Sequence, residues 1–194
     1  LNNSKNYYLN RKTYINLRWI GIIGQVITIN FVALVFEFKF NFILANIVVL
    51  VGAFSNIYLF YFFKKNQLQE KISLIFLTID ILQLSFLLYL TGGIINPFSI
   101  FLIIPSIFAS NSLSIKTNNL LIFITISSII LLTFFHNELP SPLNKYIFNN
   151  YYYYSVPLAL IIALIFLNFF AIIFGQESSL RKDALDKIQQ LIAK

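Results

Sequence analysis

The chain has 194 residues, of which 58% are hydrophobic and only 11% charged, and its formal net charge is +7. A soluble domain carries roughly 25% charged residues. This composition therefore excludes a soluble domain and indicates a protein whose surface faces lipid. The basic residues lie in the gaps between apolar runs rather than along one stripe, which argues against a nucleic-acid partner. Without cysteine, the chain has no disulfide, thiol switch or thiolate metal site.

Six apolar runs follow one another, and most approach the ~20 residues needed to cross a bilayer core of ~30 Å. Backbone groups in lipid must be bonded within their own segment, so the runs are predicted to be helices. They cover roughly residues 15–36, 42–63, 72–90, 97–115, 120–135 and 156–174. The fourth run contains Pro105 and the fifth is short, so a re-entrant pair is the alternative there. The predicted fold class is an all-α polytopic membrane protein with about six transmembrane helices and a C-terminal amphipathic signalling helix.

The lysines and arginines divide unequally between the two sides of such a protein. Of the 14 in the chain, only Lys39 and Lys145 fall on the side opposite the N-terminus. Because basic loops are retained in the cytoplasm, both termini are predicted to be cytoplasmic. The other twelve are Lys5, Arg11, Lys12, Arg18, Lys64, Lys65, Lys71, Lys116, Arg181, Lys182, Lys187 and Lys194.

The character of the sequence changes after the sixth run. Leu185, Ile188 and Ile192 step by three and then four positions among Lys, Asp and Gln, which predicts an amphipathic helix. It is either an interfacial helix or, as we favour, the start of a parallel dimeric signalling helix. The predicted domains are a cytoplasmic segment 1–13, a six-span membrane domain 14–175, and the start of a linker or dimerisation helix 176–194.

The loop between the third and fourth runs reads Thr-Gly-Gly-Ile-Ile-Asn-Pro-Phe over residues 91–98. Paired glycines end a helix because they adopt left-handed angles without steric cost, and Asn followed by Pro begins the next. Alone, this is a tight turn. At the lipid boundary, however, exposed backbone N–H groups and a helix N-terminus beside an aromatic ring can bind a carbonyl oxygen and stack on a flat ring. A quinone head group has both features.

From Asp80 to Phe98 the sequence resembles the sensor region of RegB-type redox histidine kinases. Their signature is a Gly-Gly-x-x-Asn-Pro-Phe heptapeptide in the second outer loop of a six-span domain. Residues 17–25, which open the first run, are similar to that family as well. The five fixed positions of the heptapeptide are matched by Gly92, Gly93, Asn96, Pro97 and Phe98.

This resemblance implies the membrane sensor domain of a two-component histidine kinase in the bacterial inner membrane. In that family the heptapeptide is implicated in binding ubiquinone, whose redox state sets kinase activity, so the five matched residues are expected to bind ubiquinone or a similar quinone. Family members continue into a dimerisation helix with the phospho-accepting histidine and an ATP-binding domain. We therefore expect a homodimer whose full-length form acts on a response regulator, with no catalytic residue and no metal in this segment.

Asp80 is the only acidic residue well inside a predicted span. Burying an ionised carboxylate there costs about 2.5 kcal/mol or more. With no Lys or Arg expected at its depth, it is predicted to be protonated or bonded to amides such as Gln25, Asn30, Asn56, Gln83 or Asn168. It is either a polar clasp between helices or a relay of a proton or conformational signal from the quinone site. Gln83 shares its helix face at three residues' spacing.

Two other functions remain open on the sequence. A small transporter or channel subunit would show an internal repeat or a path lined by polar residues, and a structural membrane subunit would dock a partner through its cytoplasmic helix. His136, the single histidine, is expected to be a solvated residue of the outer loop.

Overall fold

A computed structural model describes residues 8–35, 37–110, 112–139, 154, 156–158, 160–165, 167–169 and 171–173. The amphipathic helix predicted at 176–194 lies outside these residues. In the described part, four labelled helices are long and apolar enough to cross a membrane, and a further helix over Val156–Ile173 makes five. The four are α1 (Arg11–Leu34), α2 (Phe42–Phe62), α3 (Glu70–Leu90) and α5 (Ile115–Phe134). The prediction of an all-α polytopic membrane protein is confirmed.

The fourth apolar run folds differently from the others. After a single 3-10 turn, η1 (Gly93–Ile95), it forms a seven-residue 3-10 helix, η2 (Pro97–Ile103), followed by the seven-residue α4 (Ile104–Ser110). A 3-10 helix rises about 2.0 Å per residue against about 1.5 Å for an α-helix. The run therefore covers more depth than its length suggests.

Contacts at both ends of α3 show that the fourth run passes from one end of the bundle to the other. The Asn96 side chain donates to the carbonyl oxygen of Thr91 at the C-terminal end of α3, 2.9 Å away. The backbone N–H of Ser114 donates to Glu70 at the N-terminal end of α3, 3.0 Å away. The segment does not return to the end it started from, which excludes the re-entrant alternative.

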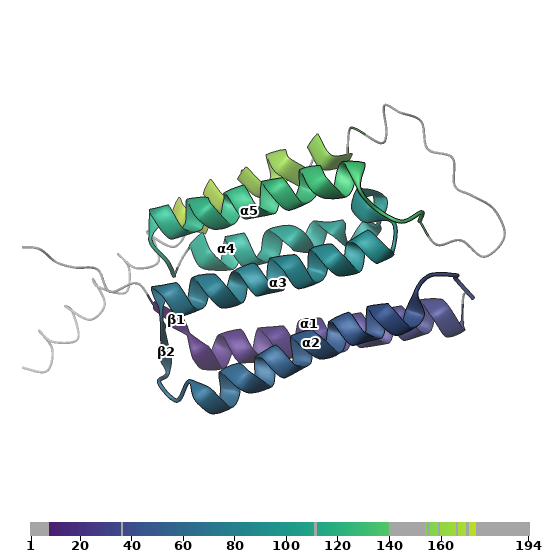
Figure 1. The fold of residues 1–194 in the computed structure, drawn as a ribbon. Helices are drawn as coiled ribbons and strands as arrows, with labels where there is room; N and C mark the ends of the chain where they lie inside the picture. Colours follow the sequence, from purple (N-terminus) through teal and green to yellow (C-terminus); the bar gives the residue numbers. More distant parts are fainter. Residues whose placement is uncertain are drawn as a thin grey trace, which may run out of the picture.

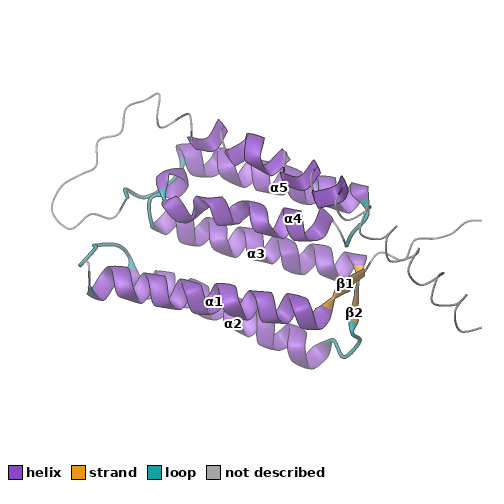
Figure 2. Cartoon of the chain, turned by 180° about the vertical axis from the view of Figure 1, so that it is seen from behind, coloured by secondary structure: helices purple, strands orange, loops and turns teal. Residues whose placement is uncertain are grey.

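Two short strands close one end of the bundle. β1 (Tyr8–Asn10) pairs antiparallel with β2 (Gln67–Gln69), with Leu9 opposite Leu68. We call this the strand end, and the opposite end, with residues 91–96, the loop end. Figure 2 shows the strands beside the start of α1. In Figure 1, α1 and α2 form one layer, α3 lies in the middle, and α4 and α5 lie on its other side.

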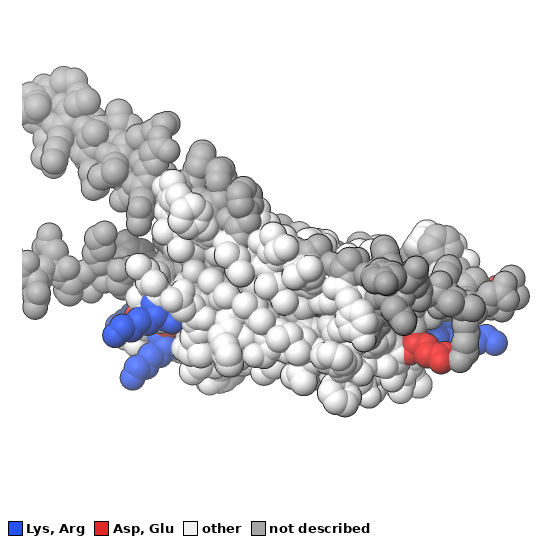
Figure 3. Space-filling model, turned by 90° about the horizontal axis from the view of Figure 1, so that it is seen from above, with Lys and Arg blue, Asp and Glu red and all other residues white. Residues whose placement is uncertain are grey.

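The surface between the two ends is apolar. Ile20, Phe54 and Phe123 are 68%, 67% and 66% exposed on three different helices. Figure 3 shows an uncharged band with charged side chains gathered at its two ends. Such a band suits lipid and not water.

Candidate functional site: the loop after α3 and a polar cluster between helices

The glycine pair ends α3 and turns the chain. The N–H of Thr91 still bonds to the Leu88 carbonyl at 2.9 Å, and then Gly92 and Gly93 take φ angles of 109° and 62°. Both angles are left-handed, where a side chain would strain the backbone. The helix therefore stops here because glycine follows it.

Asn96 holds the rest of this loop together. Its Oδ1 accepts from the backbone N–H of Phe98 at 2.9 Å, which caps η2 with Pro97 in the first turn, as the sequence predicts. Its Nδ2 donates to both the carbonyl oxygen and the hydroxyl of Thr91, each at 2.9 Å. One side chain thus ties the end of α3 to the start of η2.

The segment that follows α5 covers the two glycines. A Cβ on Gly92 would lie 2.4 Å from Leu139 Cδ1, and one on Gly93 would lie 2.4 Å from His136 Cγ. The N–H of Asn137 donates to the Tyr89 carbonyl at 2.8 Å. Both glycines are buried, so the expectation of an exposed backbone is wrong at these positions. His136 is half-buried against Gly93 and is not the solvated loop residue expected.

The exposed part of the loop is Pro97 and the ring of Phe98. Phe98 is 40% exposed and stacks on Phe101, with ring centres 5.9 Å apart. The five residues of the heptapeptide therefore divide in two. Gly92, Gly93 and Asn96 build the turn, and Pro97 and Phe98 form its surface. A flat ligand could stack on the aromatic face that Phe98 presents.

A second group of polar side chains lies inside the bundle, which we call the polar cluster. On α3, Asp80 Oδ1 accepts from Arg18 Nε at 2.9 Å and forms an ion pair with Nη2 at 2.7 Å, while Oδ2 accepts from the Tyr14 hydroxyl at 2.5 Å. Arg18 also donates to α2, to Ser55 at 3.0 Å and to Asn56 at 3.4 Å. The cluster of Tyr14, Arg18, Ser55, Asn56 and Asp80 therefore joins three helices.

The expectation that no cation lies at the depth of Asp80 is wrong. Arg18 is seven residues into α1 and Asp80 ten residues into α3, both measured from the strand end. At a rise of about 1.5 Å per residue the two backbones differ in depth by about 5 Å, which a long arginine side chain covers. Arg18 is thus a buried partner of Asp80 and not one of the loop cations. The other basic residues remain unevenly divided between the two sides of the protein.

Gln83 lies one turn farther along α3 and makes a separate contact with α1. Its Nε2 donates to Gln25 Oε1 at 2.9 Å. Its side chain also packs beside Gly52 on α2, where an added Cβ would make an ordinary van der Waals contact, 3.5 Å from Gln83 Cδ. Asp80 and Gln83 thus both bridge α3 to α1 through side chains. Of the amides expected around Asp80, only Asn56 belongs to the cluster, and it bonds to Arg18 rather than to the carboxylate.

Further interhelical contacts were missed by the sequence reasoning. Asn118 on α5 donates to Asn168 on the last helix at 3.3 Å, and the hydroxyls of Ser106 and Thr125 join α4 to α5 at 2.9 Å. All four side chains are buried. For Ser106, Thr125 and Asn168 the signal in the sequence is a polar residue within an apolar run, whereas Asn118 lies in the polar stretch before the fifth run.

Comparison with known proteins gives one informative similarity. The chain is 31% identical over 126 residues to the sensor histidine kinase RegB of Cereibacter sphaeroides, an alignment that covers 64% of this chain and 27% of that protein. The chain thus spans about a quarter of the relative's length. No protein-family model matches it, and neither does any solved structure. The chain is therefore a partial homologue of sensor histidine kinase RegB, and its own apolar helices are long enough to cross a membrane.

Proposed function

We propose that the chain is the membrane sensor domain of a two-component histidine kinase and that the loop of residues 91–98 binds ubiquinone or a similar quinone. The similarity to sensor histidine kinase RegB supports the first part. The exposed ring of Phe98, in a loop with the heptapeptide pattern of RegB-type kinases, supports the second. No catalytic role for any residue of this chain is included in the proposal.

In this proposal the quinone ring stacks on Phe98, and one of its carbonyl oxygens competes for Asn96 Nδ2. That nitrogen holds the end of α3 through its two hydrogen bonds to Thr91. A ligand that takes this donor weakens the tie between α3 and η2. Binding at the loop is thereby linked to the position of α3.

The signal is a shift between two arrangements of the helices. Oxidised and reduced quinone must bind with different affinity, because a ligand moves such an equilibrium only by its preference for one state. The loop also contacts the end of α5, and α5 is tied to the last helix by Asn118 and Asn168. The last helix would pass the change to the kinase part of a homodimer and so to its response regulator.

The proposed orientation places the strand end in the cytoplasm and the loop end on the outer side of the bacterial inner membrane. In the described ranges, all of the basic residues outside the polar cluster except Lys39 lie at the strand end. Basic residues gather on the cytoplasmic side of bacterial membrane proteins. In this chain, the basic residues at the strand end are Arg11, Lys12, Lys64, Lys65, Lys71 and Lys116.

Asp80 and Gln83 have a supporting role in this proposal. Both carry side chains that bridge α3 to α1. We propose that they act as a clasp that keeps α1 attached to α3 when the loop of residues 91–98 responds to quinone. Through this clasp, Asp80 relays the conformational change from α3 to α1.

The test is photoaffinity labelling of the chain in nanodiscs with an azidoquinone, with and without excess quinone as competitor. We expect saturable labelling of the peptide that contains residues 91–98. A Phe98→Ala variant should bind about twofold to twelvefold more weakly, since an aromatic stack contributes about 0.5–1.5 kcal/mol. Phe134→Ala, which removes an aromatic ring that is 65% exposed near the same end of the bundle, is the matched control.

Unsaturable labelling spread over all helices would show that quinone only partitions into the bilayer. Equal labelling of wild type and both variants would remove the quinone part of the proposal. The kinase part would then still rest on the similarity to the relative.

A further inference from the structure

A lipid-facing groove of about 500 Å³ lies between α2 and α3, on the half of the bundle nearer the strand end. Its lining includes the buried Phe76 and the half-buried Ser55. Its walls include Phe54 and Tyr58 from α2 and Ile75 and Ile79 from α3. Phe54, Tyr58 and Ile75 are 67%, 50% and 57% exposed, whereas Phe76 is 5% exposed. The groove is therefore open along its length to the surrounding lipid.

The lining offers almost nothing to a polar ligand. Apart from the Tyr58 hydroxyl on its wall, the one polar side chain is Ser55, and its hydroxyl already accepts from Arg18 of the polar cluster at 3.0 Å. The other lining residues are apolar, and Phe63 packs edge-on against Phe76 with ring centres 5.8 Å apart. A hydrocarbon chain is the ligand that suits such walls.

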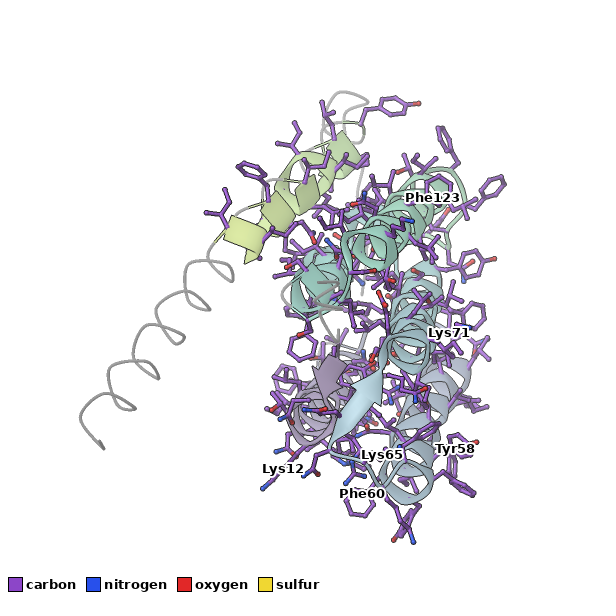
Figure 4. The ribbon with its side chains drawn as sticks, turned by 90° about the vertical axis from the view of Figure 1, so that its left-hand side faces the viewer. Lys12, Tyr58, Phe60, Lys65, Lys71 and Phe123 are labelled. Atoms are coloured by element: carbon purple, nitrogen blue, oxygen red, sulfur yellow. The ribbon has the colours of Figure 1, made fainter. Side chains whose placement is uncertain are left out.

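Three lysines are sequence neighbours of lining residues at the strand end of the groove. Lys64 and Lys65 follow directly after Phe63, and Lys71 directly precedes Ile72; both flanking residues line the groove. Lys71 lies one turn before Ile75 on the same face of α3, and side chains on a helix tilt toward its N-terminus, here the strand end. Figure 4, seen from that end, shows Lys71 and Tyr58 on the same side of the bundle and Lys12 on another.

The charge of these lysines is not neutralised within the described part of the chain. All three are exposed, and none forms an ion pair with a described residue. The nearest acid in sequence, Glu70, is turned to α5, where it accepts from the backbone N–H of Ser114 and the hydroxyl of Thr117. Lys64, Lys65 and Lys71, which we call the lysine rim, therefore carry three positive charges that no described acid pairs with, at the level of the lipid head groups.

We propose that this groove and its lysine rim bind one anionic phospholipid. One acyl chain lies between α2 and α3, and the phosphate lies against Lys64, Lys65 and Lys71. Basic residues at the membrane surface each favour an anionic lipid, by about fivefold in affinity. A zwitterionic lipid offers the same chain but no net charge, so the charge complementarity selects the anionic head group.

The same charges argue against a second copy of the chain as the occupant. A symmetric dimer through this face would apply the same patch on both subunits. The three lysines of one subunit would then face the three of its partner across the axis, and like charges at such an interface repel. A lipid phosphate brings the opposite charge instead.

Native mass spectrometry of the chain with phosphatidylglycerol or phosphatidylcholine of identical acyl chains tests the proposal. We expect phosphatidylglycerol to bind about tenfold or more tightly, and Lys65→Ala/Lys71→Ala to remove on the order of tenfold of that affinity. The matched control, Lys12→Ala/Lys116→Ala, removes two exposed lysines of the same end that do not adjoin the groove. Ile75→Trp fills the groove without changing any charge and should also weaken binding.

Four results would overturn the proposal. Equal affinity for the two lipids would remove the charge selection, and equal losses in the two lysine pairs would reduce it to general surface charge. Unchanged lipid binding in Ile75→Trp would show that the groove holds no acyl chain. If that variant instead altered the monomer–dimer equilibrium, the face would be an interface between two copies.

Discussion

Arg18 and Asp80 lie 62 residues apart in sequence, yet their charged groups meet at 2.7 Å between α1 and α3. Their side chains are 5% and 22% exposed. A buried ion pair adds little stability relative to well-packed apolar residues, but breaking it leaves an uncompensated charge that is strongly unfavourable. The pair therefore specifies which face of α1 meets α3, because any other arrangement leaves both charges unpaired in the membrane.

The first prediction concerns the removal of one partner of this pair. Asp80→Ala leaves Arg18 without its counter-charge and should lower the free energy of unfolding by about 3–5 kcal/mol. The double variant Arg18→Met/Asp80→Leu removes both charges and should be more stable than Asp80→Ala alone. Thermal unfolding in a mild detergent measures both effects.

Gln83→Leu is the control, since it removes an uncharged interhelical contact on the same face of α3. Such contacts in membranes contribute about 0.6 kcal/mol on average and about 1.7 at most. If Asp80→Ala cost no more than Gln83→Leu, the ion pair would have no special part in fixing α1.

The positions of the helices could be predicted from the sequence because a helix that crosses the lipid core needs about 20 consecutive, mostly apolar residues. The runs at 42–63 and 72–90 closely match α2 and α3, Phe42–Phe62 and Glu70–Leu90. The first helix begins four residues earlier than its apolar run because Asn10 caps it, accepting from the Thr13 N–H at 3.1 Å. Hydropathy does not register a cap, so this boundary was missed.

The partners of polar residues inside the spans could not be predicted in the same way. The charge pattern counts Arg18 with the basic residues of the cytoplasmic side, and its pairing with Asp80 exists only once α1 lies near α3. The cover over the glycine pair likewise comes from residues 136–139, more than 40 positions away in sequence. The turn itself is a local property, and its burial depends on the tertiary structure.

A second prediction tests the close packing at the glycine pair. Gly93→Ala places a methyl group 2.4 Å from His136 Cγ and 2.8 Å from the Leu132 carbonyl oxygen, at a φ of 62°. The left-handed backbone alone costs about 1–2 kcal/mol, and overpacking about 1–3 kcal/mol more. We expect a loss of about 2–5 kcal/mol in the free energy of unfolding, measured by thermal melting of the purified chain.

Gly24→Ala in α1 is the matched control, because nothing lies within 4 Å of the added Cβ. Alanine is the better helix former by about 1 kcal/mol, so this variant should melt at the same temperature or higher. Similar melting of Gly93→Ala and Gly24→Ala would contradict both the left-handed backbone at Gly93 and the cover by the segment after α5.

A third prediction separates the two tasks of the Asn96 side chain. Asn96→Ser keeps an oxygen that can cap the Phe98 N–H but loses the amide donors that hold Thr91. Asn96→Ala loses both, and loss of a cap costs about 1 kcal/mol. We expect stability in the order wild type, Asn96→Ser, Asn96→Ala. An Asn96→Ser variant as unstable as Asn96→Ala would show that the contact with Thr91, and not the cap, carries the effect.

The last prediction concerns the tie between α5 and the last helix, where Asn118 Nδ2 donates to Asn168 Oδ1 at 3.3 Å. Asn118→Ala and Asn168→Ala should each lower the free energy of unfolding by about 0.5–2 kcal/mol. Because they remove the same contact, the double variant should cost less than the sum, with a coupling energy near 0.6 kcal/mol. Asn119→Ala, an exposed neighbour on α5, should change stability by less than about 0.5 kcal/mol. If the losses in the free energy of unfolding of the two buried variants were strictly additive, only apolar packing of side chains such as Leu164 would hold the last helix. A signal would then have to reach that helix by displacing this packing.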